Sequence, residues 1–310
     1  MKNKFVTSIE EKLKKLHLKP AETPAAQAER KEECFKSVAE NEEKHRVFFK
    51  ASLSADPEIQ RALANEVYIL KKITALKNGG HVLLPKFING KAGKKFIWHV
   101  REYVDGENFG DWQTGFKKSV LDDNHYAKKL ALGIYYLQVN LLATADEKKL
   151  SVRKAEQVLK DGKLLATKLA QEKIITDSLK DSLIKKLSEP ASQETLVFCH
   201  GNLEPKNILY SKNEVGLINW KNATTSNPAM DIGYIWAYSL GNKEWQKEFI
   251  DSYLALSSNQ SIVEKRLETE KIYRTLHTIN RFKQESKIQS IKGDKKRFFD
   301  LLKEALATLV

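Results

Sequence analysis

Several features that this 310-residue chain lacks narrow its possible classes. Only two cysteines occur, Cys34 and Cys199, in different predicted parts of the chain, so we expect two buried, reduced thiols rather than a disulfide or a metal site. No apolar run approaches the roughly 20 residues that a membrane-spanning helix needs. The N-terminal stretch MKNKFVTSIEEKLKKLHL is amphipathic and charged, without an apolar signal core, which predicts a cytoplasmic location and no membrane span.

Negative charge is in deficit. The chain has 53 lysines and arginines against 40 acidic residues, which gives a net charge of +13. Lysine supplies most of this excess, and lysine is common on solvated helix faces, whereas binding sites for phosphates favour arginine. No zinc-finger, RNA-recognition or helix-turn-helix signature occurs. Nucleic acid is therefore a partner that the sequence allows but does not favour.

The most informative pattern runs from Leu196 to Trp236 and reads LVFCHGNLEPKNILYSKNEVGLINWKNATTSNPAMDIGYIW. The apolar run before His200 predicts a buried strand, HGNLEPKN predicts a polar loop, and ILYS and GLINW predict two short strands around a turn. Asp231 precedes an apolar segment that is typical of a helix. From Asp122 onward, helical periodicity dominates up to this pattern, and helices resume at Lys243.

This order of elements resembles the catalytic half of the aminoglycoside phosphotransferase and choline kinase-like family, in which the loop reads HGDxxxxN and the metal-binding strand ends in IDW. The resemblance covers about residues 31–310 of this chain. It implies a two-lobed, protein kinase-like α+β fold. We expect a helix and linker at residues 1–30, a small β-rich N-terminal lobe at 31–104, and a larger helical lobe at 105–310 that carries the loop.

Both acidic positions of the family's catalytic site hold amides in this chain. The resemblance assigns the base position to Asn202 and the metal positions to Asn207 and Asn219, of which only Asn207 is the family's residue. An amide has no charge and no useful basicity, so Asn202 can orient a hydroxyl group but cannot take its proton. Magnesium favours anionic oxygens, so we expect Asn219 to bind it weakly. The resemblance gives His200 and Asp231 structural roles in the loop.

The N-terminal half supplies the candidates for nucleotide binding. Lys50 ends a β-type run and Glu66 opens an amphipathic helix, which is how the resemblance places a nucleotide-contacting lysine and its glutamate partner. The stretch FIWHVREYVDGENFGDW resembles the family's hinge, whose backbone meets an adenine. The implied cofactors are ATP and magnesium, both bound weakly. The hinge candidates are Arg101, Glu102, Tyr103 and Val104.

Two further departures from the family concern its phosphate site. No glycine occurs before Gly79, whereas family members usually place a glycine-containing turn between the first two strands, where backbone N–H groups approach the phosphates. Residues 21–46 should hold that turn and are rich in acidic side chains, so we expect a displaced or long loop. Glu204 places a negative charge where the transferring phosphoryl group would sit, and it is also the candidate for a substitute base.

Three hypotheses for function follow. The leading one is a pseudokinase that acts as a binding or regulatory module for a small-molecule or protein ligand. The first alternative is an active ATP-dependent phosphotransferase of a small hydroxylated or amino substrate, with rewired acid-base residues. The second alternative is a basic protein that binds anions or nucleic acid on a kinase-like fold.

Overall fold

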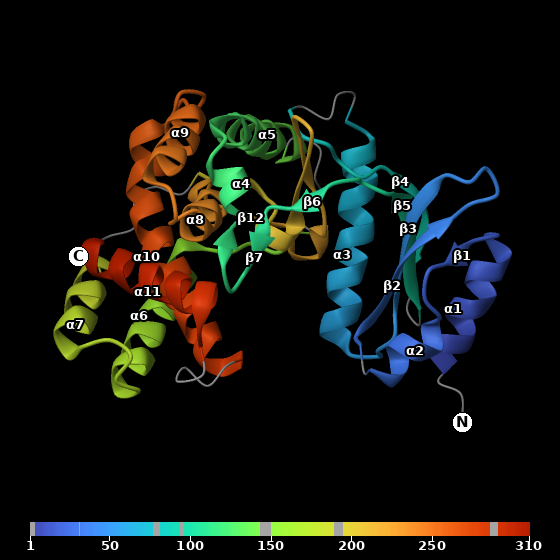
Figure 1. The fold of residues 1–310 in the computed structure, drawn as a ribbon, viewed down its shortest axis with the longest axis horizontal. Coiled ribbons are helices and arrows are strands. Elements are labelled where there is room, and N and C mark those ends of the chain that lie inside the picture. The colour runs from blue at the N-terminus through green and yellow to red at the C-terminus, as the bar shows by residue number, and fades with distance from the viewer. Residues whose placement is uncertain are drawn as a thin grey trace. The chain divides into compact units, whose positions relative to one another are not determined.

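The computed structural model describes residues 4–30, 32–76, 81–93, 96–142, 150–188, 195–285 and 291–310. They form a mixed α/β fold in two compact units (Figure 1). Unit 1 consists of Met1–Gly79, Leu83–Asp105 and Leu217–Ala223, and unit 2 consists of Gly80–Val82, Gly106–Gly216 and Thr224–Val310. Two points differ from the division expected from the sequence. The N-terminal helix belongs to the compact body of unit 1, and so does the short segment that contains Asn219.

Unit 1 is built on a five-stranded antiparallel sheet in the order β1–β2–β3–β5–β4. The pairing is most extensive between β2 and β3, which are joined by a tight turn. Strand β1 has only two residues and pairs with the last two residues of β2. The strands are β1 (Lys19–Pro20), β2 (Cys34–Glu40), β3 (Arg46–Ser52), β4 (Phe87–Ala92) and β5 (Ile97–Glu102).

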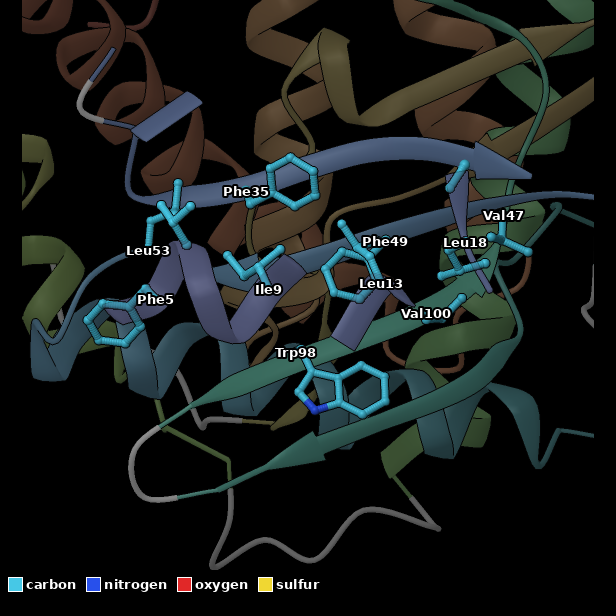
Figure 2. Close-up of a cluster of buried hydrophobic side chains, with 13 residues drawn as sticks. Phe5, Ile9, Leu13, Leu18, Phe35, Val47, Phe49, Leu53, Trp98 and Val100 are labelled. Carbon is cyan, nitrogen blue, oxygen red and sulfur yellow. The ribbon is translucent and has the colours of Figure 1, made fainter. Parts of the chain in front are cut away.

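Helix α1 (Lys4–Lys15) covers one face of this sheet. Its main apolar residues recur at every fourth position, which places them on a single stripe. Figure 2 shows this stripe packed against large side chains of β2, β3 and β5. The N-terminal helix therefore completes a hydrophobic core. That core consists of Phe5, Val6, Ile9, Leu13, Leu18, Phe35, Ala39, Val47, Phe49, Ala51, Leu53, Trp98 and Val100.

The linker expected after α1 is partly folded. It contains β1 and the short helix α2 (Pro24–Glu29), in which the side chain of Thr23 accepts a hydrogen bond from the N–H of Ala26. Helix α2 lies in the chain between β1 and β2, where the family resemblance would place the glycine-containing turn. We expected a displaced or long loop here, and the structure has a short helix instead. The absence of glycine suits this outcome, because helical residues need no positive φ angle.

Helix α3 (Pro57–Thr74) packs against the opposite face of the sheet. It begins at the N-cap Asp56, whose carboxylate accepts hydrogen bonds from the backbone N–H groups of Glu58 and Ile59. Its apolar side contributes to a second buried cluster with β2 and β5. Unit 1 therefore has three layers, namely α1 with α2, the sheet, and α3 (Figure 1).

Unit 2 is mainly helical, and the described part of the chain has no helix that is both long and apolar enough to cross a membrane. The helical periodicity predicted from Asp122 onward corresponds first to α5, whose apolar residues from Tyr126 to Leu141 are buried, and α9 begins at Lys243. Both Cys34, in unit 1, and Cys199, in unit 2, are free and buried. The helices are α4 (Lys118–Leu121), α5 (Asn124–Leu142), α6 (Ala155–Gln171), α7 (Asp177–Lys186), α8 (Ala229–Tyr238), α9 (Lys243–Leu254), α10 (Gln260–Glu285) and α11 (Gly293–Thr308).

Short strands and two 3-10 turns surround the predicted loop. The strand predicted over GLINW is shorter in the structure, where β11 ends at Leu217. The chain turns at Asn219, which adopts a φ of +68°. Asparagine tolerates this left-handed conformation better than most residues, and it turns the chain out of the sheet. These elements are β6 (Glu107–Asn108), β7 (Gly110–Asp111), β8 (Gly115–Phe116), β9 (Val197–Cys199), β10 (Ile208–Ser211), β11 (Glu214–Leu217), β12 (Thr224–Ser226), η1 (Pro205–Asn207) and η2 (Trp220–Asn222).

Candidate functional site

Asp231, in the first turn of α8, holds the loop that follows β9. Its Oδ2 accepts a hydrogen bond from the N–H of His200 at 2.8 Å, and its Oδ1 accepts one from Gly201 at 3.0 Å. Gly201 has a φ of +77°, which favours glycine. Burial raises the pKa of Asp231 to about 6, although the two backbone hydrogen bonds and then Arg274 act to lower it. The carboxylate therefore fixes the backbone of the loop.

Asn202 and Asn207 are linked within this loop. The Nδ2 of Asn207 donates to the carbonyl oxygen of Asn202 at 2.8 Å, and the N–H of Asn202 donates to Nδ1 of His200 at 3.3 Å. All three residues are buried. Because Nδ1 of His200 accepts, it carries no proton in this arrangement. These hydrogen bonds link both ends of the loop, and Asn202 has the amide at the position that the resemblance assigns to the base.

Glu204 is held between two cations. Its Oε1 lies 2.8 Å from a guanidinium nitrogen of Arg281, and its Oε2 lies 3.0 Å from Nζ of Lys206. The same guanidinium lies over the ring of Trp112, 4.0 Å from the ring centre. Both carboxylate oxygens of Glu204 are therefore engaged by protein groups. This geometry does not favour Glu204 as a base that takes a proton from a substrate.

Helix α10 and the segment before α6 carry two further arginines. Arg153 and Arg274 both pair with the buried Glu270, with N–O distances of 2.9 and 3.5 Å. The ring of His277 reaches solvent in part, yet its pKa is lowered to about 4, first by desolvation and then by Arg274 and Arg281. Arg274 and Arg281 therefore both act on His277, although each of them is also paired with a glutamate. Sequence reasoning missed this group, whose only signal was the recurrence of basic residues at helical spacing.

Lys50 and Glu66, paired by the sequence prediction, meet in unit 1 as a buried ion pair. Nζ of Lys50 also donates to Oδ1 of Asn219 at 3.4 Å. His99, which was not among the predicted candidates, lies on β5 with Nε2 3.7 Å from the same oxygen of Glu66. Burial opposes ionisation of Glu66, but the charge of Lys50 and the neighbouring ring of His99 hold its pKa well below the ordinary value.

Asn65 anchors the segment that contains Asn219. Its Nδ2 donates to the carbonyl oxygens of Lys221 at 3.1 Å and of Ala223 at 2.9 Å, which fixes η2 against α3. Asn65 immediately precedes Glu66 in the helix. The helix that positions Glu66 therefore also positions the residues after Asn219, a relationship that no local sequence pattern indicates.

A row of polar residues crosses the sheet at Lys50. Lys36 on β2 and His99 on β5 are its direct neighbours in the two adjoining strands. The backbone N–H and C=O of Lys36 both bond to the side chain of Gln27, so they point away from β3. Partial burial lowers the pKa of Lys36, and the charges of Lys50 and Lys221 lower it further. Lys36 and Lys50 thus lie opposite each other on neighbouring strands, and the charge of Lys221 acts on Lys36.

The predicted hinge occupies the end of β5 and the residues that follow. Arg101 is buried, with its guanidinium over the ring of Phe48 at 4.3 Å and a hydrogen bond of 2.9 Å to the carbonyl of Glu102. Burial lowers its pKa to about 10. Val104 is buried, and Tyr103 is half-buried between it and Glu102. The Arg101 side chain therefore packs within unit 1.

The residues at the predicted metal positions do not fit magnesium. Asn219 offers one neutral oxygen, which already accepts a hydrogen bond from Lys50, and the Asn207 amide donates within its own loop. Across the described ranges, no group of three or more histidine, cysteine, aspartate or glutamate side chains is arranged to hold a metal ion. Magnesium prefers anionic oxygens in octahedral geometry. The donor set lacks the carboxylate that would be its main ligand.

Comparison with known proteins identifies relatives of this fold. Residues 41–265 match the model of a phosphotransferase enzyme family. A comparison with curated protein sequences finds no match. Solved structures match nearly the whole chain. Their sequence identities to it are low, so the match shows a shared fold.

Three of these structures illustrate the match. The GDP complex of aminoglycoside 2'-phosphotransferase-IIIa has a TM-score of 0.60 at 16% identity and covers 89% of this chain and 90% of its own. Macrolide 2'-phosphotransferase MphH from Brachybacterium faecium has a TM-score of 0.60 at 13% identity, covering 96% and 98%. Choline kinase LicA from Streptococcus pneumoniae has a TM-score of 0.56 at 15% identity, covering 97% and 98%.

Proposed function

The chain belongs to the phosphotransferase enzyme family, and we propose that within this family it is a pseudokinase, which binds a nucleotide or a related phosphate compound without transferring a phosphoryl group. One observation carries the proposal. At the position of the main metal ligand, Asn219 presents a neutral oxygen that accepts a hydrogen bond from Lys50. A carboxylate is missing there, and another is missing at Asn202.

These two losses act on different parts of the reaction. General-base catalysis is typically worth about a hundred- to ten-thousandfold in rate, and Asn202 cannot supply it. Charge neutralisation by magnesium is a further requirement of phosphoryl transfer, and Asn219 provides no anionic ligand for the ion. The one nearby candidate for a substitute base, Glu204, is engaged by Arg281 and Lys206. The site therefore keeps little capacity for phosphoryl transfer.

Nucleotide binding is supported by what remains. The buried pair of Lys50 and Glu66 keeps an ammonium group fixed on β3, in the arrangement used to contact nucleotide phosphates. In the hinge, the N–H of Glu102 already donates to the carbonyl oxygen of Lys86. The backbone groups left for a nucleotide base are therefore those of Tyr103 and Val104. One structure with the same fold is a GDP complex.

The charges around the loop in unit 2 favour an anionic ligand over a cationic one. Glu204, Glu270 and Glu285 are paired with Lys206, Arg153, Arg274 and Arg281, so these ion pairs hold four cations against three carboxylates. A polycationic aminoglycoside would meet repulsion there. We therefore expect a small anionic molecule, or an acidic segment of a protein, as the natural ligand, and a binding or regulatory role for the protein.

The test combines binding and turnover. Wild-type protein is titrated with ATP and GTP by calorimetry, with magnesium and with a chelator, and is assayed for transfer from labelled ATP to kanamycin, choline and simple sugars. We expect binding that does not need magnesium and no transfer above the protein-free background. Lys50→Met should abolish binding, whereas Lys91→Met, on the exposed strand β4, should leave it unchanged. Sustained turnover of any acceptor contradicts the proposal.

A further inference from the structure

We propose that Lys36 and Lys221 join Lys50 in a cradle of three ammonium groups that binds the ligand's phosphates directly, in place of both magnesium and a glycine-rich loop. This inference rests on the proposed function, because it specifies how the same site holds its ligand. All three lysines belong to unit 1, so the cradle is complete within one compact body. Neither Lys36 nor Lys221 was a candidate from the sequence.

The first support is the register of the sheet. Lys36 lies directly opposite Lys50, and its backbone groups bond outward to Gln27 rather than to β3. Lys36 and Lys50 therefore form a non-hydrogen-bonded antiparallel pair, in which the two side chains share one face and approach each other most closely. Like charges in this position destabilise a sheet, unless an anion lies between them.

The second support is the anchoring of Lys221. The two hydrogen bonds from Asn65 fix the backbone of η2, and with it Lys221, against α3, the helix that packs on the face of the sheet carrying Lys50. The charge of Lys221 lowers the pKa of Lys36. Within the described ranges, neither Lys36 nor Lys221 forms an ion pair with a carboxylate. Glu66 is the one buried acid nearby, and Lys50 already occupies it. With Glu66 paired to Lys50 and the charge of Glu32 acting on Lys36, the three lysines carry one positive charge more than these two acids offset.

The third support is what the cradle would replace. Phosphate loops present backbone N–H groups, and they need glycine to do so closely. Here the corresponding part of the chain is helix α2, whose Gln27 clamps the backbone of Lys36 and so holds that lysine in its register. An ammonium group is a compact donor with three N–H bonds and a full charge. Because Lys50 also pairs with Glu66, the three groups offset part of the negative charge of a triphosphate and not all of it.

The probe is inorganic triphosphate, titrated by calorimetry in the presence of a chelator, with ATP and adenosine in parallel. Triphosphate and ATP should bind the full-length wild-type protein, and their affinity should fall as salt is raised. Lys36→Gln and Lys221→Gln should each weaken binding about tenfold, the size expected for one charge-assisted contact. Lys36→Arg, which keeps the charge, should retain most of the affinity. Lys91→Gln removes one charge from the same sheet and should have no effect.

Melting temperatures of all variants show whether each one folds, and the remaining outcomes separate the two proposals. If ATP binds only with magnesium, or if both glutamine variants bind like wild type, the cradle is wrong while nucleotide binding stands. If adenosine binds and triphosphate does not, the cradle is also wrong. If no phosphate compound binds under any condition, the proposed function fails together with it.

Discussion

The side chain of Gln27 hydrogen-bonds to both backbone groups of Lys36: its Nε2 donates to the carbonyl oxygen at 2.7 Å, and its Oε1 accepts from the N–H at 2.9 Å. One amide thus takes the place of a neighbouring strand at this point of the sheet. Strand β1 pairs only with the far end of β2, so without Gln27 the edge of β2 would be open at Lys36. A side chain from α2 therefore completes the sheet.

Gln27→Ala should destabilise unit 1 by about 2 kcal/mol, because it leaves a partly buried donor and acceptor of β2 without partners. Gln27 is 3% exposed, so water reaches the vacated space poorly. Chemical denaturation of the two proteins measures the difference. Gln157→Ala removes an exposed amide that bonds to Asp161 on α6, and it should cost much less. Equal losses for both variants would show that the Gln27 contacts contribute nothing.

Asn219→Asp should strengthen binding of magnesium-ATP about tenfold, because it supplies an anionic oxygen where the family holds the ion. Titrations at matched magnesium concentration compare it with wild type. Asn213→Asp adds the same charge to an exposed turn and controls for nonspecific electrostatics. Unchanged affinity for Asn219→Asp would mean that this residue does not occupy the metal-ligand position.

The double variant Asn202→Asp with Asn219→Asp should still transfer little or no phosphate. Restoring a base and a metal ligand leaves the phosphates without a glycine-rich loop to position the γ-phosphoryl group, and positioning contributes several kcal/mol to such reactions. An assay with labelled ATP and a panel of small acceptors measures transfer. Rapid phosphorylation would show that the two carboxylates were the only functions lost.

His277→Gln should make the protein less sensitive to acid. The pKa of His277 in the folded protein is about 4, below its ordinary value of 6.5, so the unfolded chain binds more protons between these limits. The stability associated with a neutral His277 is present above pH 6.5 and is lost as the pH falls toward 4. The melting temperature of wild type should therefore drop more steeply than that of the variant over this range. His125→Gln, at an exposed position of α5, should follow wild type.

Local patterns predicted the parts of this protein that depend on neighbouring residues. The family resemblance paired Lys50 with Glu66, and periodicity indicated the β-type run and the amphipathic helix that carry them. The order of strands and loop around His200 followed from alternation and turn residues, which need only the chain's own periodicity to be recognised.

The missed features depend on contacts between distant parts of the chain. Helix α2 is stabilised by the clamp from Gln27 to β2, and Glu204 meets Arg281, 77 positions away. The early end of β11 depends on the left-handed conformation of Asn219, which the apolar pattern around it masked. In the sequence, His99 is simply one polar residue in a predicted strand. The register of the sheet places it opposite Lys50, and so near Glu66. Sequence spacing cannot predict such pairings.

Ile9→Ala should cost about 2 to 5 kcal/mol of unfolding free energy, because Ile9 is fully buried between α1 and the sheet and its removal leaves a cavity. Denaturation with urea gives the measurement. Val139→Ala, at a position that is 51% exposed on α5, should change stability by less than about 0.5 kcal/mol. A small effect at Ile9 would show that α1 is only loosely attached.

The packing of α1 also bears on where this protein can be cut. The family match begins at residue 41, after β2, and ends at residue 265, within α10. A fragment trimmed to those limits would discard α1, α2 and two strands, and would expose Phe49 and Trp98, which Figure 2 shows beneath the helix. It would also lose Arg274 and Arg281. Recombinant fragments bounded by the family signature should therefore aggregate, and the segments outside it are integral parts of the folding unit.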